Sequence, residues 1–367
     1  MKVCKFGGTS LCDAKQFHKV YKIIKGDSSR RYVIVSAPGK RFLNDIKVTD
    51  ALYECWEKAS RRESIEPLFH EICERYNKII KDLGLQLMLD KEYEVIYRHL
   101  NGELNRDYIA SRGEYLNRMI MAAYLEYDFI DAADVIVFNS DGSFNSDKTN
   151  SCVCKILEEH PRAVIPGFYG ADDSRKIVTF SRGGSDITGA LVAKGVCADV
   201  YENWTDVPGF LMVSPALIPN ARKVDYMCYG ELLQLGRLGA AVFHSDAVLP
   251  LCETGIPIHI RNTNMPEQAG TMICRELPPF VQGKVFACGI AVENVFGLSG
   301  DASKETVLLH LIGYGLSAVI PDILSALHGA DVKPLFVKES ANDCIFGIKK
   351  QQMIEASSVI YAVVGKK

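Results

Sequence analysis

The stretch Lys5-Phe6-Gly7-Gly8-Thr9-Ser10 directly follows a strand pattern that starts at Met1. Two segments of similar character occur later, Ser-Arg-Gly-Gly-Ser-Asp at Ser181–Asp186 and Trp-Thr-Asp-Val-Pro-Gly at Trp204–Gly209. Each places glycines, charged groups and hydroxyls at an expected strand end, which is where open α/β sheets hold phosphate groups. Together the three segments favour phosphoryl transfer.

Short apolar strand patterns alternate with helical periodicity along the chain. The strand patterns are Arg31–Ala37, Ala163–Gly167 and Ile177–Phe180. Continuous apolar runs of this kind suit a parallel sheet that is covered on both faces. Between Thr49 and about Leu100, apolar residues recur at helical spacing, which predicts a helical excursion, and a further helix is predicted to open at Ser111–Glu114. The order of these patterns indicates an α/β fold.

Length, charge and composition narrow the class of partner. With 367 residues and 48% hydrophobic content, the chain can bury a full core and form two domains. A formal charge of -3 without a run of Lys or Arg predicts neither nucleic-acid nor membrane binding, so a small-molecule partner is expected. The absence of an apolar leader and of long uncharged apolar stretches predicts a cytoplasmic location. Twelve cysteines without Cys-x-x-Cys pairs indicate reduced thiols rather than a metal site.

The composition shifts at Arg275–Pro279, where two prolines end the alternation of strands and helices. We therefore expect one domain over residues 1–278 and a smaller one over residues 279–367. In the smaller domain, strands are predicted at Val285–Val292, Thr306–Ile312, Val332–Val337 and Asp343–Ile348, and helices at Ser317–His328 and Gln351–Val363. This order predicts a small α+β unit.

The first glycine segment has the features of a phosphate site. A glycine pair after a strand lets backbone N–H groups approach phosphate oxygens without interference from a Cβ atom. Lys5, next to Gly7 and Gly8, would offset the charge of a transferring group. Taken alone, a tight turn explains the segment about equally well. The Rossmann and P-loop patterns are absent, so neither a dinucleotide nor a P-loop site is predicted.

The segment Ser181–Asp186 is more specific. The Arg182 guanidinium suits a carboxylate and the Asp186 carboxylate suits an ammonium group, and an α-amino acid carries both. An Arg–Asp pair that closes a loop before the next helix accounts for the same residues equally well. Glu114 is either a further acceptor for an ammonium group or a first-turn carboxylate stabilised by the helix dipole, and in isolation the dipole explanation is favoured.

Taken together, these segments resemble the aspartate kinases of the amino acid kinase family. The motifs that carry the resemblance are Lys5–Leu11, Val35–Ala37, Lys47–Asp50, Ser111–Glu114, Phe180–Asp186 and Trp204–Gly209. The resemblance implies a three-layer αβα domain with a mostly parallel central sheet, followed by a small α+β ACT-like domain. It implies transfer of the ATP γ-phosphoryl group to the side chain of L-aspartate, giving 4-phospho-L-aspartate for lysine, threonine and methionine biosynthesis. Mg²⁺ would accompany ATP.

The resemblance also implies roles for individual residues. Lys5 and Asp186 are expected to be catalytic. The residues expected to bind ATP are Lys5, Phe6, Gly7, Gly8, Thr205 and Asp206. Those expected to hold aspartate are Ser36, Thr49, Glu114, Arg182, Gly183, Gly184 and Ser185. A protein-bound metal is not among the implied features.

The chain departs from the family pattern where the nucleotide should bind. Ser214-Pro215-Ala216 stands where the family usually has Asp-Pro-Arg, and Ala241 stands where many relatives have lysine. These changes support an alternative hypothesis, a catalytically weak paralogue that binds aspartate or an effector as a regulatory subunit. A third hypothesis, a kinase of the same fold acting on glutamate or acetylglutamate, is disfavoured by Ser111–Glu114 and Ser181–Asp186.

The tail is too short for the two ACT modules of the family. One βαββαβ module can be assembled from Thr306–Val363 if Val285–Val292 supplies the missing strand. Gly313–Gly315 then occupies the position of the family's effector loop. An effector site between two such modules requires a second subunit, so a homodimer or a higher homo-oligomer is expected.

Overall fold

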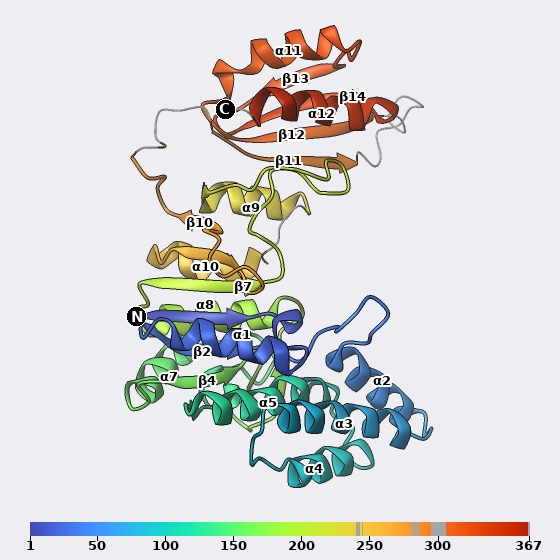
Figure 1. The fold of residues 1–367 in the computed structure, drawn as a ribbon, viewed down its shortest axis with the longest axis vertical. Helices are drawn as coiled ribbons and strands as arrows, with labels where there is room; N and C mark the ends of the chain where they lie inside the picture. The colour runs from blue at the N-terminus through green and yellow to red at the C-terminus, as the bar shows by residue number, and fades with distance from the viewer. Residues whose placement is uncertain (240–242, 244, 280, 282–285, 295–305, 366–367) are drawn as a thin grey trace. The chain divides into compact units, whose positions relative to one another are not determined.

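The computed structural model describes residues 1–239, 243, 245–279, 281, 286–294 and 306–365, and Figure 1 traces the chain. It divides into one unit formed by Met1–Val207 and Asp246–Gln268, and a second formed by Pro208–Ser245 and Ala269–Lys367. This division differs from the boundary expected after residue 278, because residues 208–245 and 269–278 group with the tail. A separate domain of residues 279–367 alone therefore stays a prediction.

A parallel sheet forms the centre of the first unit. Its strands follow the order β3-β4-β2-β1-β7-β9, and their described pairings are all parallel. They are β1 (Lys2–Phe6), β2 (Arg30–Val35), β3 (Asp128–Phe129), β4 (Ala163–Pro166), β7 (Val200–Thr205) and β9 (Ile258–Asn262). β5 (Tyr169–Ala171) and β6 (Ile177–Thr179) form a separate antiparallel ribbon. The mostly parallel sheet and the predicted strands at Arg31–Ala37 and Ala163–Gly167 are confirmed. The run Ile177–Phe180 also forms a strand, but its expected place in the parallel sheet was wrong, because it pairs antiparallel with β5 and is only half-buried.

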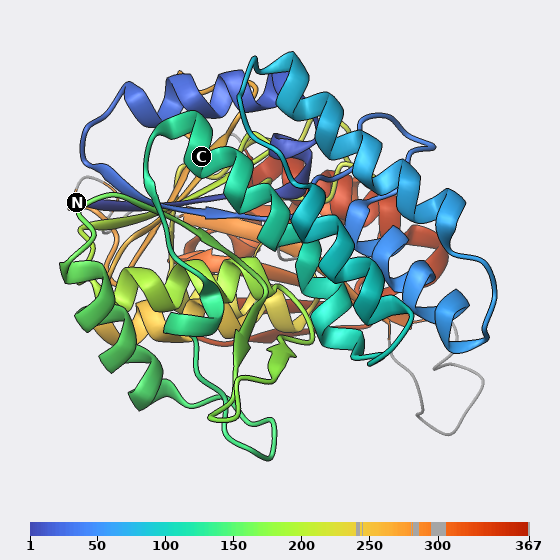
Figure 2. The same ribbon diagram turned by 90° about the horizontal axis from the view of Figure 1, so that it is seen from below.

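Helices cover both faces of this sheet. The helices are η1 (Gly8–Leu11), α1 (Ala14–Lys25), α2 (Val48–Ser60), α3 (Glu66–Asp82), α4 (Asp90–Leu100), α5 (Arg106–Leu125), α6 (Ala132–Val135), α7 (Ser146–Glu158), α8 (Gly184–Gly195) and α10 (Ser245–Thr254). Figure 2 shows the sheet between a layer containing α1 and α5 and a layer containing α7 and α8. The predicted three-layer αβα architecture is confirmed. Within the described residues, the helices lack the combination of length and apolarity that a membrane span requires.

The predicted helical excursion is formed by α2, α3 and α4. On α3, the side chains of Phe69, Ile72, Tyr76 and Ile79 are buried, which matches their helical spacing. Burial of each such side chain stabilises the fold by roughly 1.5–3 kcal/mol. The Tyr76 hydroxyl also donates a hydrogen bond of 2.7 Å to the carbonyl of Gly113 on α5. The excursion therefore supports the helix that carries Glu114.

The second unit contains an antiparallel sheet with the strand order β11-β12-β14-β13. The elements of the second unit, including those outside this sheet, are β8 (Tyr226–Cys228), α9 (Tyr229–Arg237), β10 (Thr271–Cys274), β11 (Phe286–Asn294), β12 (Thr306–Tyr314), η3 (Leu316–Ala318), α11 (Ile320–Gly329), β13 (Phe336–Glu339), β14 (Asp343–Lys349), η4 (Lys350–Gln352) and α12 (Met353–Val364). The order of strands and helices confirms the predicted ACT-like arrangement, including β11 as the added strand.

Several bounds in the tail differ from the predictions. The helix expected from Ser317 begins at Ile320, after η3, and the strand expected to end at Ile312 continues to Tyr314, so Gly313 of the expected effector loop belongs to the strand. The strand expected from Val332 begins at Phe336, after Pro334, whose nitrogen carries no hydrogen for a strand ladder. Val285, the expected first residue of the added strand, lies outside the described residues, and the strand begins at Phe286.

Candidate active site

The carboxyl ends of three neighbouring parallel strands meet at one edge of the first unit. Phe6 on β1 pairs with Val35 on β2 and with Trp204 on β7. The residues at and just after these strand ends, which include the first glycine segment, Ser36 and Thr205, are therefore brought together. This edge is where open α/β sheets place their ligand sites.

A hollow of about 190 Å³ opens at this edge. Its lining consists of Lys5, Ser36, Thr49, Glu114, Phe168, Gly183, Gly184, Ser185 and Asp186. These residues come from distant parts of the sequence, and all except Phe168 are among the predicted site residues. The sequence therefore indicated most of the wall of one cavity.

Lys5 and Asp186 form an ion pair in the wall of the hollow. The Lys5 Nζ lies 2.7 Å from Asp186 Oδ1, and the two side chains are only 11% and 15% exposed. Asn203 on β7 donates from Nδ2 to the same oxygen at 2.8 Å. Electrostatic interactions are stronger in such a shielded position than at the surface. Of the two explanations left open for Ser181–Asp186, the loop-closing Arg182–Asp186 pair is not found, since the described ion pair of Asp186 is with Lys5.

Glu114 is buried in the middle of α5 and reaches the hollow. Its Oε1 accepts a hydrogen bond of 3.0 Å from the backbone N–H of Ala37, whereas its Oε2 is buried and has no hydrogen-bond partner in the described structure. Burial raises the pKa of Glu114 to about 8. An unpartnered carboxyl oxygen in a cavity wall is a strong acceptor for an entering cation.

The helix dipole does not explain Glu114. α5 begins at Arg106 rather than at Ser111, because the Asn105 side chain caps it by accepting hydrogen bonds of 3.0 and 3.1 Å from the backbone N–H groups of Asp107 and Tyr108. Glu114 therefore lies well beyond the first turn. The expectation that this helix opens at Ser111–Glu114 was wrong, and so was the dipole explanation that it favoured.

The amino end of α8 forms another part of the wall. Gly183, which precedes the helix, has a φ of 59°, a left-handed conformation that glycine adopts without strain. A Cβ atom on Gly184 would lie 2.7 Å from the Cα of Phe168, so only glycine permits this close approach. The free backbone N–H groups and the dipole of this helix end favour a negatively charged group in the hollow.

Phe168 is the lining residue that the sequence analysis missed. Its φ of 82° is unusual for a bulky residue and indicates local backbone strain. Its N–H donates to Thr188 Oγ1 at 3.2 Å, and its carbonyl accepts from Phe180 N–H at 2.9 Å. The sequence gives one indication of this region: a glycine at position 167 directly follows an apolar strand. Such a glycine indicates that another segment of backbone passes close by, but it does not indicate that the side chain of Phe168 lines a cavity.

The first glycine segment lies beside the end of β7. The N–H of Gly7 donates to the carbonyl of Trp204 at 3.0 Å. Phe6 is completely buried and its ring stacks on that of Trp204 at 5.9 Å, so its side chain supports the segment and does not face the hollow. Gly8 crosses the chain at Ala37 and Gly39 so closely that a Cβ atom on Gly8 would lie 2.8 Å from the carbonyl oxygen of Ala37 and 3.1 Å from the nitrogen of Gly39. This crossing is a structural reason for the glycine at position 8, beside its predicted phosphate role.

Several predicted residues do not line the hollow. Arg182 directly precedes its wall, and its side chain is exposed. Thr205 and Asp206 extend from the end of β7, where the Thr205 hydroxyl lies 3.2 Å from Asp206 Oδ1. Ser214 and Ala216 belong to the second unit and are exposed. Ala241 lies outside the described residues.

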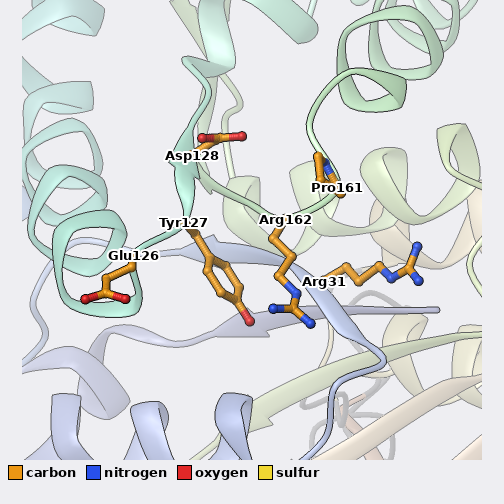
Figure 3. A pocket seen from close by; sticks show the side chains of 6 residues that line it. All are labelled: Arg31, Glu126, Tyr127, Asp128, Pro161 and Arg162. Atoms are coloured by element: carbon orange, nitrogen blue, oxygen red, sulfur yellow. The ribbon is translucent and has the colours of Figure 1, made fainter.

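A second hollow, of about 420 Å³, lies at the opposite edge of the same sheet (Figure 3). It is lined by Arg31, Glu126, Tyr127, Asp128, Pro161 and Arg162. Arg31 is the second residue of β2, and the others lie at or just before the first residues of β3 and β4, so all are at the amino ends of the strands. Although it is larger, this hollow lacks the glycine segments and the convergence of strand ends that mark the first one.

The comparison with protein families agrees with this geometry. The model of the amino acid kinase family matches residues 1–262. The chain belongs to this family. Within it, the chain resembles aspartokinases: it is 35% identical to Aspartokinase 3 of Bacillus subtilis over 74% of its own length and 63% of the relative's. The chain also spans 44% of a bifunctional aspartokinase/homoserine dehydrogenase of Buchnera aphidicola, at 27% identity.

Solved structures of aspartate kinases resemble this chain over its whole length. The aspartate kinase of Clostridium acetobutylicum matches with a TM-score of 0.88 at 31% identity, covering 100% of both chains. Aspartokinase III of Escherichia coli, solved in complex with aspartate and ADP, matches with a TM-score of 0.77 over 99% of both chains, but at 18% identity it supports the fold alone. The resemblance inferred from the motifs is confirmed.

Proposed function

We propose that this protein is an aspartate kinase, which transfers the γ-phosphoryl group of ATP to the side-chain carboxylate of L-aspartate. The products are 4-phospho-L-aspartate and ADP. The observation that carries the proposal is the unpartnered Oε2 of Glu114 in a hollow that also contains the Lys5–Asp186 pair and the amino end of α8. An acceptor for a cation matches the ammonium group of aspartate, a helix amino end matches a carboxylate, and a lysine matches the transferring phosphoryl group.

On the substrate side, we assign the ammonium group of aspartate to Glu114. Asp186 is less suited to this task, because its Oδ1 already accepts hydrogen bonds from Lys5 and Asn203. The exposed guanidinium of Arg182 is free to reach the α-carboxylate, which it would hold through two parallel hydrogen bonds. The assigned roles of Ser36, Thr49 and Ser185 as further substrate contacts belong to the same proposal.

On the phosphoryl side, a side-chain carboxylate oxygen of aspartate attacks the γ-phosphorus while the bond to the bridging oxygen of ADP breaks. The attacking carboxylate is already ionised at neutral pH, so no general base is required. Lys5 lies where it can neutralise charge on the transferring group, and Gly8 offers a backbone N–H group. The N–H of Gly7 already donates to the carbonyl of Trp204, so Gly7 contributes the close approach of a backbone without a Cβ atom. Positioning and charge neutralisation account for most of the catalysis in such transfers.

Mg²⁺ enters this proposal as part of the ATP complex. Phosphate oxygens are its usual ligands in kinases, and it neutralises phosphate charge when bound. Among the residues that the structure describes, no group of three or more His, Cys, Asp or Glu side chains gathers to hold a metal ion. The roles of Thr205 and Asp206 as ATP contacts, the cytoplasmic location, the biosynthetic pathway and a homo-oligomeric state are parts of the proposal.

A coupled assay of ADP release tests the proposal directly. The protein is supplied with MgATP and with aspartate, with glutamate, or with no acceptor. Aspartate-dependent release of ADP, well above that with glutamate, is the expected result. Release that is equal with all three would contradict the proposal, and aspartate binding without turnover would favour a regulatory subunit.

A further inference from the structure

A polar residue in the central strand β7 is unexpected on physical grounds. Asn203 lies on a strand with neighbours on both sides, where asparagine is depleted and apolar residues pack best. Its side chain is only 5% exposed. A buried amide must be hydrogen-bonded to be tolerated, so its partner indicates why it is there.

The partner is the carboxylate of the proposed catalytic pair. Asn203 Nδ2 lies 2.8 Å from Asp186 Oδ1, the same oxygen that lies 2.7 Å from Lys5 Nζ. Lys5 and Asn203 are directly opposite each other in the parallel register of β1 and β7, so both side chains emerge on the same face of the sheet. α8 packs on this face and supplies Asp186. One carboxylate oxygen is therefore held from two strands at once.

The two donors to Asp186, Lys5 and Asn203, have different tasks during the reaction. When Lys5 turns toward a phosphoryl group, its interaction with Asp186 weakens, and a buried carboxylate that loses a donor is destabilised. Asn203 is neutral and belongs to a rigid strand, so it retains its hydrogen bond and does not compete with Lys5 for the phosphoryl charge. It also keeps Asp186 from following Lys5.

We propose that Asn203 is a positioning residue, which fixes the Asp186 carboxylate so that Lys5 is aimed at the transferring phosphoryl group. This inference rests on the proposed kinase function. It predicts that Asn203 acts only through Asp186, and that its loss impairs the chemical step more than the binding of either substrate.

The test compares Asn203→Leu, which has similar volume and no donor, with Asn203→Asp, which has the same shape and a carboxylate in place of the amide. The maximal rate is expected to fall about 10- to 100-fold in Asn203→Leu, the size of one lost hydrogen bond to a charged group, with Michaelis constants changed less than about threefold. In an Asp186→Asn background, Asn203→Leu should have little further effect. A full additional loss in that background, or a loss confined to the Michaelis constants, would overturn the inference.

Asn203→Asp adds a second measurement, the pH dependence of the rate, which would not change if Asn203 were purely structural. Its rate relative to wild type should recover as the pH falls, because protonation of one carboxyl in the pair at 186 and 203 restores a donor and removes a repulsion. The titratable groups that face this pair are Lys5 from β1, Tyr201 from β7, whose hydroxyl donates to the Asp186 carbonyl at 3.4 Å, and Glu114 from α5, across the hollow. A pH-independent ratio would contradict the inference, and this variant also serves if Asn203→Leu does not fold.

A matched control is available far from the hollow. Thr149 on α7 is 1% exposed, and its hydroxyl accepts a hydrogen bond of 2.9 Å from the backbone of Val137. Thr149→Val should lower the thermal stability as a lost buried hydrogen bond does, without changing the maximal rate. If wild type shows no aspartate-dependent turnover, the proposed function fails, and a crystal structure of Asn203→Leu then decides the inference. A displaced Asp186 carboxylate would support it, and an unmoved one would refute it.

Discussion

The proposed substrate half of the site, around Glu114, and the proposed nucleotide half, from Gly7 to Asp206, are built differently. In the substrate half, a carboxyl group is buried inside a helix and faces a hollow whose shape is fixed by packing. In the proposed nucleotide half, Asp206 is exposed, and the glycines at positions 7 and 8 can offer only backbone groups. Buried charged groups have large individual effects, whereas exposed ones are weakened by solvent. Substitutions in the substrate half should therefore change function more than those in the nucleotide half.

The largest effect is expected at Lys5, which serves both halves. Its charge matters most when the phosphoryl group is in transfer, so Lys5→Met should lower the maximal rate about 10²- to 10³-fold with small changes in the Michaelis constants. Steady-state kinetics with both substrates measures this. Lys2→Met is the matched control, because Lys2 lies at the other end of the same strand, where its Nζ lies 2.9 Å from Asp27. A loss at Lys5 that is confined to the Michaelis constants would contradict its role.

The next effect concerns Glu114 and pH. Because burial raises the pKa of Glu114 to about 8, the group is mostly neutral in the empty site at pH 7, and an ammonium group entering beside it favours the ionised form. Aspartate affinity should therefore rise between about pH 6 and pH 8.5. In Glu114→Gln the affinity should be roughly 10- to 100-fold weaker at pH 8.5, and its rise with pH should be lost.

Calorimetry gives a second measure of the same linkage. Ionisation of Glu114 on binding should release close to one proton per aspartate at pH 7, seen as a dependence of the binding enthalpy on the buffer. Glu114→Gln should release none. The same raised pKa stabilises the empty fold at low pH, and this contribution is lost as the pH rises through about 8. Proton release that is unchanged in Glu114→Gln would show that the ammonium group lies elsewhere.

A smaller effect is expected at Arg182. The guanidinium is exposed in the empty site, so part of the free energy of its pairing with a carboxylate is lost to solvent. Arg182→Ala should raise the Michaelis constant for aspartate about tenfold and leave that for ATP nearly unchanged. Arg175→Ala is the control, because this exposed arginine pairs with Asp134 at 2.8 Å, away from the hollow. Equal aspartate affinity in the two variants, by calorimetry, would make Arg182 a structural residue.

Much of the fold and of the hollow could be predicted from local patterns. Apolar runs and helical spacing gave the strands and the helical excursion because burial imposes those periods. Lys5, Ser185 and Asp186 were recognisable because each stands beside glycines at a strand or helix end. Phe168 was not, since its place depends on a chain crossing that local patterns do not encode.

Asn203 and the charge state of Glu114 depend on tertiary structure in the same way. Nothing near Asn203 in the sequence indicates that α8 brings Asp186 against it. The start of α5 was also misjudged, because the Asn105 cap lies several residues before the motif that drew attention. Burial and pairing between distant segments decide such features, so a single sequence reveals them poorly.

The smallest effect is expected at Ala216, which stands where the family usually has an arginine expected to contact ATP phosphates. An arginine that contacts a phosphate contributes about 1.5–3 kcal/mol when shielded, and less when exposed. Ala216→Arg, together with Ser214→Asp, should therefore lower the Michaelis constant for ATP by about tenfold or less while leaving that for aspartate unchanged. Ala216→Gln is the uncharged control and should have no such effect. Tight ATP binding by the unmodified protein, with no gain on adding the arginine, would show that other groups already neutralise the triphosphate. The nucleotide half would then be as complete as the substrate half, and the contrast between them would lie in exposure alone.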